Sequence, residues 1–488
     1  MNALEGLKPE KVYKFFGEIA AIPHGSGNLD QISNYLVRFA EERGLRYIQD
    51  RYLNVIIFKD ASSDNVNSYP VIIQGHMDMV TLAEDGHRID FLTEPVALVR
   101  DGDFIRADRT TLGADDGIAL AFALAVLDDD SLSHPPIEAV FTVDEEIGML
   151  GAAAIDTSPL KGKYFLNIDS EEDGIFYAGC AGGATCTISR PFKKEQAGGK
   201  AYSINISGLS GGHSGVEIHR QSANACHILG RILFTLKESG FKINLFSVNG
   251  GEKDNAIAVK TNAVFYTHTY PDLPDLKSLI KKTSDDIRYI YKTTDPLMSI
   301  SITEVKSDAD FSMDAADSSA MIDLLTNLPN GIIRMSDDVN GMVETSLNLG
   351  VMRTCSDSVE FTYSVRSNID CQKDFLIMKL KNIAEHYGAA SSVSGVYGAW
   401  EYRPDSMLRS LLIDEYQNVT GRAAKTEVIH AGVECGIFLS KMPDLDCVSF
   451  GPQADDIHTP DEKMSISSLS DYWTILINIL ARLAKTND

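Results

Sequence analysis

The residues His76 and Asp78 follow an apolar run and have the types and spacing to hold a metal ion. The run is VIIQGHMDMV, residues 71–80, in which β-branched residues lead up to Gly75. In an extended chain, residues i and i+2 point to the same side, so the imidazole and the carboxylate share one face. A histidine that binds a metal commonly donates its second ring nitrogen to such a carboxylate.

Further acidic and imidazole side chains follow other apolar runs in the same way. They are Asp115 and Asp116 after TLGA, Glu145 and Glu146 after IEAVFTV, Asp169 after KYFLNI, and His458 in FGPQADDIHTPDE. In open α/β sheets, ligand sites gather at the carboxyl ends of the strands. We therefore expect these side chains to meet at one edge of a sheet.

The chemistry of this set suits divalent cations. Histidine and carboxylate without cysteine favour one or two ions such as Zn²⁺, Mn²⁺ or Co²⁺. A pair of ions about 3.5–4 Å apart needs a bridging carboxylate and terminal ligands on each side. One glutamate left unbound can then deprotonate a bridging water. Each motif alone is weak, because adjacent acids in an acidic chain are usually solvated, but charge after buried strands is expensive unless it is compensated.

The elements that must position these residues alternate in the first third of the chain. Apolar spacing predicts helices over 9–22, 29–44 and 115–130. Short runs rich in Val, Ile and Phe predict strands over 54–60, 70–78, 137–146 and 163–172. This part of the sequence therefore predicts an α/β sheet.

From about Gly182 the pattern changes to longer alternating strands, over 201–209, 255–268 and 358–370, with amphipathic helices over 276–292 and 372–388. This is typical of a second, α+β domain. It contains two rounds of a similar strand-helix-strand pattern without a sequence repeat. After about Trp400 the first pattern returns. We therefore predict a catalytic domain over 1–182 and 399–488 with an inserted domain over 183–398.

Composition limits the classes of function and the location. The chain has 488 residues and a net charge of −25, which argues against nucleic acid and anionic membranes as partners. Seven scattered cysteines without a CxxC pair indicate neither a disulfide framework nor a thiolate zinc site. The sequence has no apolar run of about 20 residues and no signal-peptide core, so we expect a cytoplasmic protein.

The five motifs GHMD, GADDG, DEEIGMLGA, NIDSEE and GPQADDIHTPDE resemble the metal-site motifs of the co-catalytic zinc exopeptidases. That superfamily includes peptidase T and carboxypeptidase G. The segments TLGADDGIALAFALAVL, GLSGGHSGVEIH and HAGVECGIF are most similar to the aminoacyl-histidine (Xaa-His, carnosinase-like) dipeptidases. The resemblance implies an α/β/α catalytic domain of the zinc-exopeptidase type with an inserted α+β lid domain.

The resemblance also implies roles for residues of the catalytic domain. His76 and Asp169 would be terminal ligands of one ion, Glu146 and His458 of the other, with Asp115 bridging both. Glu145 would be the general base, and Asp78 would orient the ring of His76. The expected cofactors are two divalent ions, most simply Zn²⁺, with Mn²⁺ and Co²⁺ as alternatives.

The inserted domain of the family acts as a lid that closes over the metals. By the same resemblance, His213 would stabilise the oxyanion of the tetrahedral intermediate. Asn255 and Arg366 would hold the substrate's carboxylate end, where a planar guanidinium binds bidentately. Gly432 would line the same pocket.

Three departures from the family pattern bear on specificity. Gly117 follows the double aspartate where many relatives have lysine, Asp116 replaces the usual asparagine, and HRQSANA after the lid motif differs from the expected basic pattern. An extra carboxylate at 116 could alter metal preference.

The expected function is dimetal-dependent hydrolysis of dipeptides, preferentially Xaa-His, through a metal-bridging water activated by Glu145. The large lid favours dipeptides over long peptides, and the smaller-lid relatives suggest a homodimer. Three alternatives stay open. They are a tripeptidase, aminoacylase or N-acyl amino-acid deacylase or carboxypeptidase with the same metals, a non-catalytic binding protein, and an acidic protein that binds cations without hydrolysis.

Overall fold

The computed structural model describes residues 3–62, 68–268, 275–306 and 311–485. The chain divides into two compact units. Unit 1 comprises Met1–Cys180, Trp400–Val428 and Val433–Asp488, and unit 2 comprises Ala181–Ala399 and Ile429–Gly432. Gly432 therefore belongs with unit 2 by its contacts, although it lies inside the range 399–488 that the sequence analysis assigned to the catalytic domain.

Unit 1 is built around an eight-stranded sheet with the strand order β1-β2-β6-β3-β7-β21-β8-β20, beside a small sheet in the order β22-β23-β5-β4. Its strands are β1 (Arg46–Gln49), β2 (Val55–Lys59), β3 (Val71–His76), β4 (Leu98–Asp101), β5 (Phe104–Ala107), β6 (Ile137–Thr142), β7 (Tyr164–Asn167), β8 (Ile175–Cys180), β20 (Lys425–Ile429), β21 (Asp446–Ser449), β22 (Ala454–Asp455) and β23 (Lys463–Ser465). Its helices are α1 (Glu10–Ala20), α2 (Asp30–Glu42), α3 (Ala114–Leu127), α4 (Leu150–Ala154), α9 (Met407–Thr420), α10 (Glu434–Lys441) and α11 (Ile466–Leu483). These elements match the helices and strands predicted for 9–60 and 70–172 to within a few residues.

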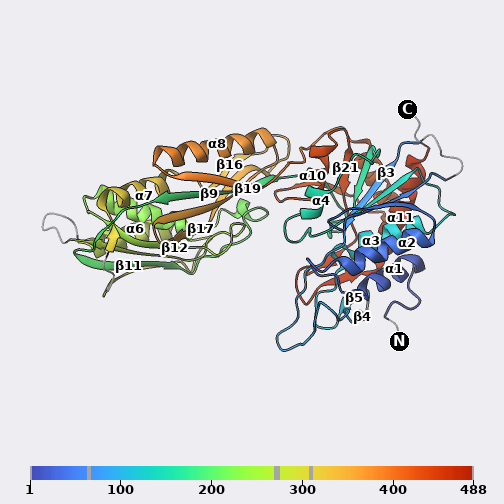
Figure 1. The fold of residues 1–488 in the computed structure, drawn as a ribbon, viewed down its shortest axis with the longest axis horizontal. Coiled ribbons are helices and arrows are strands. Elements are labelled where there is room, and N and C mark those ends of the chain that lie inside the picture. The colour runs from blue at the N-terminus through green and yellow to red at the C-terminus, as the bar shows by residue number, and fades with distance from the viewer. Residues whose placement is uncertain (1–2, 63–67, 269–274, 307–310, 486–488) are drawn as a thin grey trace. The chain divides into compact units, whose positions relative to one another are not determined.

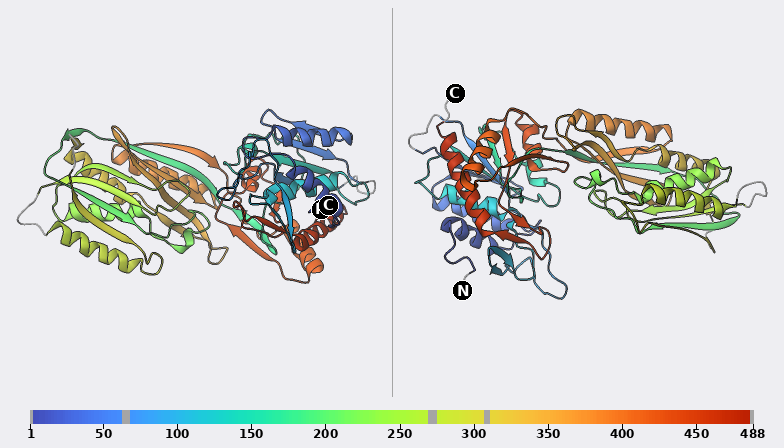
Figure 2. Two further views of the ribbon diagram at one scale, coloured as in Figure 1. Left: turned by 90° about the horizontal axis from the view of Figure 1, so that it is seen from below. Right: turned by 180° about the vertical axis from the view of Figure 1, so that it is seen from behind.

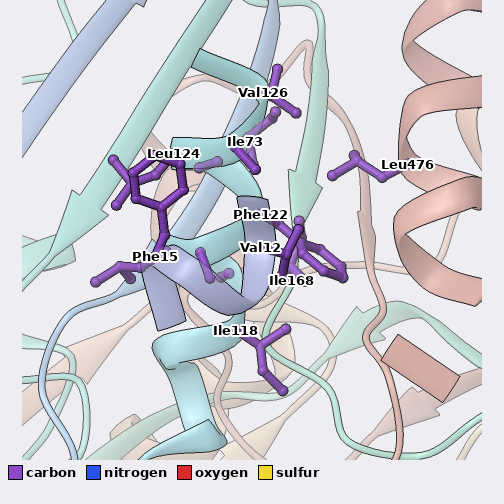
Figure 3. Packing of buried hydrophobic residues seen from close by; sticks show 14 of the residues in the cluster. Val12, Phe15, Ile73, Ile118, Phe122, Leu124, Val126, Ile168 and Leu476 are labelled. Atoms are coloured by element: carbon purple, nitrogen blue, oxygen red, sulfur yellow. The ribbon is translucent and has the colours of Figure 1, made fainter. Parts of the chain in front are cut away.

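Helices cover both faces of the large sheet (Figure 1). Because side chains alternate along a strand, Ile73 of β3 points into the core that α1, α3 and α11 share, in the same buried cluster as Phe122 (Figure 3). The next residue, Gln74, points to the other face, where its side chain meets Glu434 of α10. Helix α3 is apolar on all sides and buried along its length, as expected of a helix in a core.

The three central strands of the large sheet bring the candidate ligand residues to one edge of that sheet. β3 lies between β6 and β7 and is parallel to both. His76 pairs in register with Thr142, and Gln74 pairs with Asn167. The residues that follow these strands therefore leave the sheet side by side, which confirms the prediction that the strand ends meet.

Unit 2 is an α+β unit. Its main sheet has the order β14-β11-β13-β12-β17-β18-β9-β19, with β16 paired to β17, and β10 and β15 form a separate pair. The strands are β9 (Gly182–Pro191), β10 (Lys194–Gln196), β11 (Lys200–Ser207), β12 (Asn244–Gly250), β13 (Thr261–Thr267), β14 (Ser299–Val305), β15 (Phe311–Met313), β16 (Gly331–Met335), β17 (Val343–Thr354), β18 (Ser358–Ser367) and β19 (Ala390–Tyr397). The helices are α5 (Ala225–Glu238), α6 (Leu276–Ile290), α7 (Ala315–Asn327) and α8 (Asp370–His386), and a 3₁₀ turn spans Ile218–Arg220.

The four helices of unit 2 form one layer on its sheet, because α5 contacts α6 and α7, and α7 contacts α8 (Figure 2). Among the described residues of unit 2, the strand-helix-strand pattern occurs four times, as β11-α5-β12, β13-α6-β14, β15-α7-β16 and β18-α8-β19, where the sequence analysis expected two rounds. One predicted strand was too long. The range 255–268 forms a strand only over Thr261–Thr267, because Asn255 and Ile257 bond to the loop that carries His213 instead.

No helix among the described residues is long and apolar enough to cross a membrane. All seven cysteines lie in the described part of the chain, and all are free thiols.

Candidate metal centre and active site

The first group of ligand atoms lies where β3 and β7 end. The Nε2 atom of His76 lies 2.9 Å from Oδ1 of Asp115 and 3.5 Å from Oδ1 of Asp169. The other ring nitrogen, Nδ1, lies 2.9 Å from the backbone oxygen of Asp78. Since a carbonyl oxygen can only accept, Nδ1 carries the proton, which leaves Nε2 free to bind an ion among the carboxylates.

The second group shares Asp115 with the first. The Nε2 atom of His458 lies 3.1 Å from Oδ2 of Asp115 and 3.0 Å from Oε1 of Glu146. His458 stands in the turn between β22 and β23 with a left-handed φ of 60°. The two oxygens of Asp115 therefore face different histidines, which is the arrangement that a bridging carboxylate needs.

The charges in the two groups are interdependent. Burial lowers the pKa of His76, but the carboxylates of Asp169 and Asp115 outweigh it, so that the pKa lies well above its ordinary value. Hydrogen bonds to Asp115 and Glu146 raise the pKa of His458 to about 11. Burial raises the pKa of Asp115, yet its bonds to His458 and His76 bring it below the ordinary range. The carboxylates thus hold positive charge at both imidazoles when no other cation is present.

Asp78 ties His76 to the glutamate pair. Its carboxylate oxygens accept the backbone N–H of Glu145 at 3.0 Å and of Glu146 at 3.3 Å, and the Ser26 hydroxyl at 2.8 Å. Asp78 is 1% exposed, and its Oδ1 lies 3.5 Å from Nδ1 of His76. One buried carboxylate therefore positions residues that follow two different strands.

A carboxylate oxygen of Glu145 lies within 4.8 Å of a ring nitrogen of His76 and of a carboxylate oxygen of Glu146. Burial raises the pKa of its carboxyl well above the ordinary value, an effect that His76 opposes and Asp169 reinforces. A carboxylate with a raised affinity for protons, next to a cluster that attracts cations, has the properties of a general base.

Asp116 has a structural partner for each oxygen. Its Oδ2 accepts the backbone N–H of His76 at 3.1 Å, and its Oδ1 accepts that of Ala119 at 3.4 Å. Gly75 makes this approach possible, because a Cβ at position 75 would lie 2.4 Å from Oδ2 of Asp116. Burial and the nearby Asp169 raise the pKa of Asp116 well above its usual value.

The donor set fits divalent cations. Four groups of three His, Asp or Glu side chains place their ligand atoms within 4.8 Å of one another. They are His76-Asp116-Asp169, His76-Glu145-Glu146, Asp115-Glu146-His458 and Asp115-Asp169-Glu171. In the described ranges, no lysine or arginine forms an ion pair with these carboxylates. The excess of buried acid therefore needs positive charge from elsewhere.

In unit 2, His213 has a defined tautomer. Its Nδ1 lies 3.2 Å from the backbone N–H groups of both Gly215 and Val216. Since both are donors, Nδ1 must accept, and Nε2 carries the proton of a neutral ring. Burial, reinforced by the charge of Arg366, lowers the pKa of His213. The ring is therefore a neutral N–H donor, which suits a developing oxyanion.

The other predicted residues of unit 2 lie around the same loop or on the sheet. Asn255 is exposed and lines a cavity of about 340 Å³ together with His213. Arg366, on β18, is 8% exposed and donates from Nη1 to the Tyr397 hydroxyl at 3.0 Å, while its buried Nε has no partner. Gly432 lies two residues after the buried His430.

Sequence reasoning missed three acidic residues. Glu434 is fully buried and accepts hydrogen bonds from Gln74 and Thr142 directly beneath the strand ends, and burial raises its pKa to about 7. A carboxylate oxygen of Glu171 lies within 4.8 Å of carboxylate oxygens of Asp115 and Asp169. Glu462 accepts backbone N–H groups of the Asp115 loop. All three lie inside motifs that drew attention for other residues, so the only available signal was proximity to those motifs.

The centre and its fold define a class, the metal-dependent hydrolases with ligands at the ends of parallel strands. The sequence model of peptidase family M20/M25/M40 matches residues 72–485. The chain belongs to this family, and with it to the peptide hydrolases.

Two relatives match the chain over nearly its whole length. The cytosol non-specific dipeptidase of Escherichia coli (strain K12) is 35% identical over 486 residues, which is 99% of each chain. The crystal structure of aminoacylhistidine dipeptidase from Vibrio alginolyticus is 35% identical, with a TM-score of 0.89 over 98% of each chain. These matches confirm the predicted family and the α/β catalytic domain with its inserted lid.

A more distant structure shows the fold alone. Aminopeptidase PepT from Bacillus cereus ATCC 10987 is 16% identical, with a TM-score of 0.56 over 98% of this chain and 100% of the other.

Proposed function

We propose that the protein is a dimetal-dependent dipeptidase with a preference for Xaa-His substrates. One observation carries the proposal. Asp115 directs its two oxygens at His76 and His458, and each histidine belongs to a separate group of ligand atoms. Such an arrangement suits two ions that share one carboxylate. We assign His76 and Asp169 to one ion, and Glu146 and His458 to the other.

The residues around these ligands would perform the proton transfers. When bound, a pair of divalent ions supplies Lewis acidity that polarises the scissile carbonyl and lowers the pKa of water toward about 7. Glu145 would take the proton from the attacking water and return it to the leaving amine. Asp78 would keep Glu145 and His76 in place through its bonds to both segments.

Residues of unit 2 would recognise the substrate. The Nε2–H of His213 would donate to the oxyanion, for which its fixed tautomer suits it. Arg366 has an unpartnered Nε and could bind a terminal carboxylate. We assign Asn255 and Gly432 to the same substrate end.

The preference for histidine rests on the segments TLGADDGIALAFALAVL, GLSGGHSGVEIH and HAGVECGIF and on one relative. The two relatives have different names, since one is an aminoacylhistidine dipeptidase and the other a non-specific dipeptidase. Both share 35% identity with this chain, so the breadth of specificity needs a direct test.

The test is turnover of metal-free protein reconstituted with Zn²⁺, Mn²⁺ or Co²⁺. The substrates are carnosine, Ala-His, Ala-Ala, Gly-Gly-Gly and an N-acetyl amino acid. We expect metal-dependent cleavage with Ala-His above Ala-Ala. Cleavage of Ala-Ala as fast as Ala-His would make the protein a broad dipeptidase. Cleavage of only the tripeptide or the N-acyl substrate would move it to a sibling activity.

We further propose Zn²⁺ as the resident ion, because histidine and carboxylate ligands suit it. We also propose a cytoplasmic location, which agrees with the free thiols and with the cytosolic relative. A homodimer is proposed from the family resemblance and is tested by sedimentation of the purified chain.

A further inference from the structure

Glu462 is a buried carboxylate whose two oxygens are fully engaged by consecutive backbone amides. Oε2 accepts the N–H of Leu112 at 2.7 Å and of Gly113 at 3.2 Å. Oε1 accepts the N–H of Ala114 at 2.8 Å and of Asp115 at 3.4 Å. Glu462 is 2% exposed. Successive amides that converge on one anion form a concave cradle, which here holds a side chain of the same protein.

This clamp joins two segments that are distant in the sequence. The amides belong to the loop that ends at Asp115 and opens α3. Glu462 closes the turn that carries His458, and its own N–H donates to the oxygen of Thr459 at 3.2 Å. The next residue, Lys463, begins β23, which is paired to β5. A carboxylate fixed to a sheet on one side therefore holds the Asp115 loop on the other.

We propose that Glu462 is a positioning residue that holds Asp115 and His458 at the mutual distance required to bind two divalent ions, independently of the ions themselves. The inference rests on the proposed dimetal site. Glu462 is not itself a ligand in this account, because the four amides occupy both of its oxygens. It contributes by fixing the backbone of the shared ligand.

The chain contains a matched control, Glu138. This residue, on β6, is also a buried carboxylate, 5% exposed, and also accepts backbone amides, those of Lys161 at 2.9 Å and Gly162 at 3.0 Å. It lies near the amino end of β6, whereas the ligands follow the carboxyl end. Glu145 lies seven positions further along the chain, which is on the order of 20 Å in an extended chain.

The test compares Glu462→Gln with Glu138→Gln. Each substitution keeps the side-chain shape and replaces one accepting oxygen by an NH₂ group that faces backbone donors. The measurements are Zn²⁺ affinity by competition with a chromophoric chelator, and the midpoint of thermal unfolding of the metal-free protein. Both variants should unfold at lower temperature. Only Glu462→Gln should lose about 10–100-fold in Zn²⁺ affinity, the range found for residues that orient metal ligands.

Glu462→Asp gives a graded result. It keeps the charge but is one methylene shorter, so it should recover part of the Zn²⁺ affinity lost in Glu462→Gln. Equal losses of Zn²⁺ affinity in Glu462→Gln and Glu138→Gln at similar unfolding temperatures would overturn the proposal, because the effect would then be one of general stability.

If Glu462→Gln does not fold, hydrogen exchange of the unmodified protein tests whether Glu462 holds the Asp115 loop in the absence of ions. The clamp predicts that the amides of Leu112, Gly113 and Ala114 exchange slowly in metal-free protein and that Zn²⁺ changes their rates little. Fast exchange that slows only after Zn²⁺ is added would overturn it. Failure of the unmodified protein to bind two Zn²⁺ would instead count against the proposed function, and this exchange result would still stand on its own.

Discussion

The two candidate metal-ligand histidines of unit 1, His76 and His458, have electrostatic surroundings opposite to those of His213 and His430 in unit 2. In unit 1, carboxylates hold the pKa of His76 well above its ordinary value and raise that of His458 to about 11. In unit 2, burial and the charge of Arg366 lower the pKa of His213, and they lower that of His430 to about 3. The imidazole side chain thus lies among carboxylates that attract cations at the site in unit 1, whereas its surroundings at the two positions in unit 2 favour the neutral ring.

In the proposed function, this difference corresponds to two tasks, metal binding in unit 1 and substrate binding in unit 2. Unit 1 gathers negative charge at the ends of parallel strands, where it can hold ions. In the proposed function, the N–H of His213 and the buried guanidinium of Arg366 in unit 2 would bind the oxyanion and the substrate carboxylate. Variants in the two units should therefore fail in different ways, with loss of metal in unit 1 and loss of rate with intact metal in unit 2.

The largest effect is expected from Asp115→Asn, because the two oxygens of Asp115 face His76 and His458. Removing residues that only orient a metal ligand already lowers affinity about 10–100-fold, so loss of the shared ligand should exceed that. We expect no measurable turnover and less than two bound Zn²⁺ per chain by elemental analysis. Two tightly bound Zn²⁺ in this variant would show that Asp115 does not bridge.

Glu145→Gln should lower kcat by about 10²–10⁴-fold, the usual contribution of a general base, with Zn²⁺ content unchanged. Steady-state kinetics on Ala-His and elemental analysis of the same sample measure both quantities. Retention of more than a few per cent of the activity with metals bound would remove Glu145 from the role of base.

His213→Ala probes unit 2 and should lower kcat by about 10²–10³-fold, the range for loss of one oxyanion donor, while both ions stay bound. His219→Ala is a suitable control, because His219 lies in the same segment, and its Nδ1 bonds to the Val216 oxygen at 2.8 Å. If His213→Ala released metal as Asp115→Asn does, the proposed division of tasks between the units would be wrong.

The smallest effect concerns pH and stability in unit 2. The pKa of His430 falls from 6.5 to about 3 in the folded chain, so between these pH values only the unfolded chain binds this proton. Stability therefore falls as the pH falls through this window, by up to about 1.4 kcal/mol per pH unit. Urea unfolding of metal-free protein between pH 7 and pH 5 should show a steeper loss for the native chain than for His430→Asn. Equal slopes would contradict the neutral, buried state of His430.

The sequence alone was sufficient to predict those elements whose residue pattern is local. The β-branched run before His76 and the apolar run before Glu145 predicted strands that the structure places at Val71–His76 and Ile137–Thr142. Since parallel strands of one sheet end at a common edge, the meeting of His76 with Glu145 and Glu146 followed from those two strands.

The sequence was insufficient where position depends on a distant partner. Glu462 and Leu112 are 350 positions apart, and no periodicity relates them. The tautomer of His213 depends on two backbone amides in its own turn. The alternation around Ile257 is typical of a strand, yet the N–H of Ile257 donates to the oxygen of Gly212, and the segment forms a loop.

The most direct test of the account is activation of metal-free protein by stepwise addition of Zn²⁺, with turnover of Ala-His measured after each step. Turnover should be absent without metal and should reach its maximum as the second equivalent of Zn²⁺ binds. Full turnover after exhaustive chelation, or two bound ions with no cleavage of any dipeptide, would contradict the claim that this centre is a dimetal peptidase.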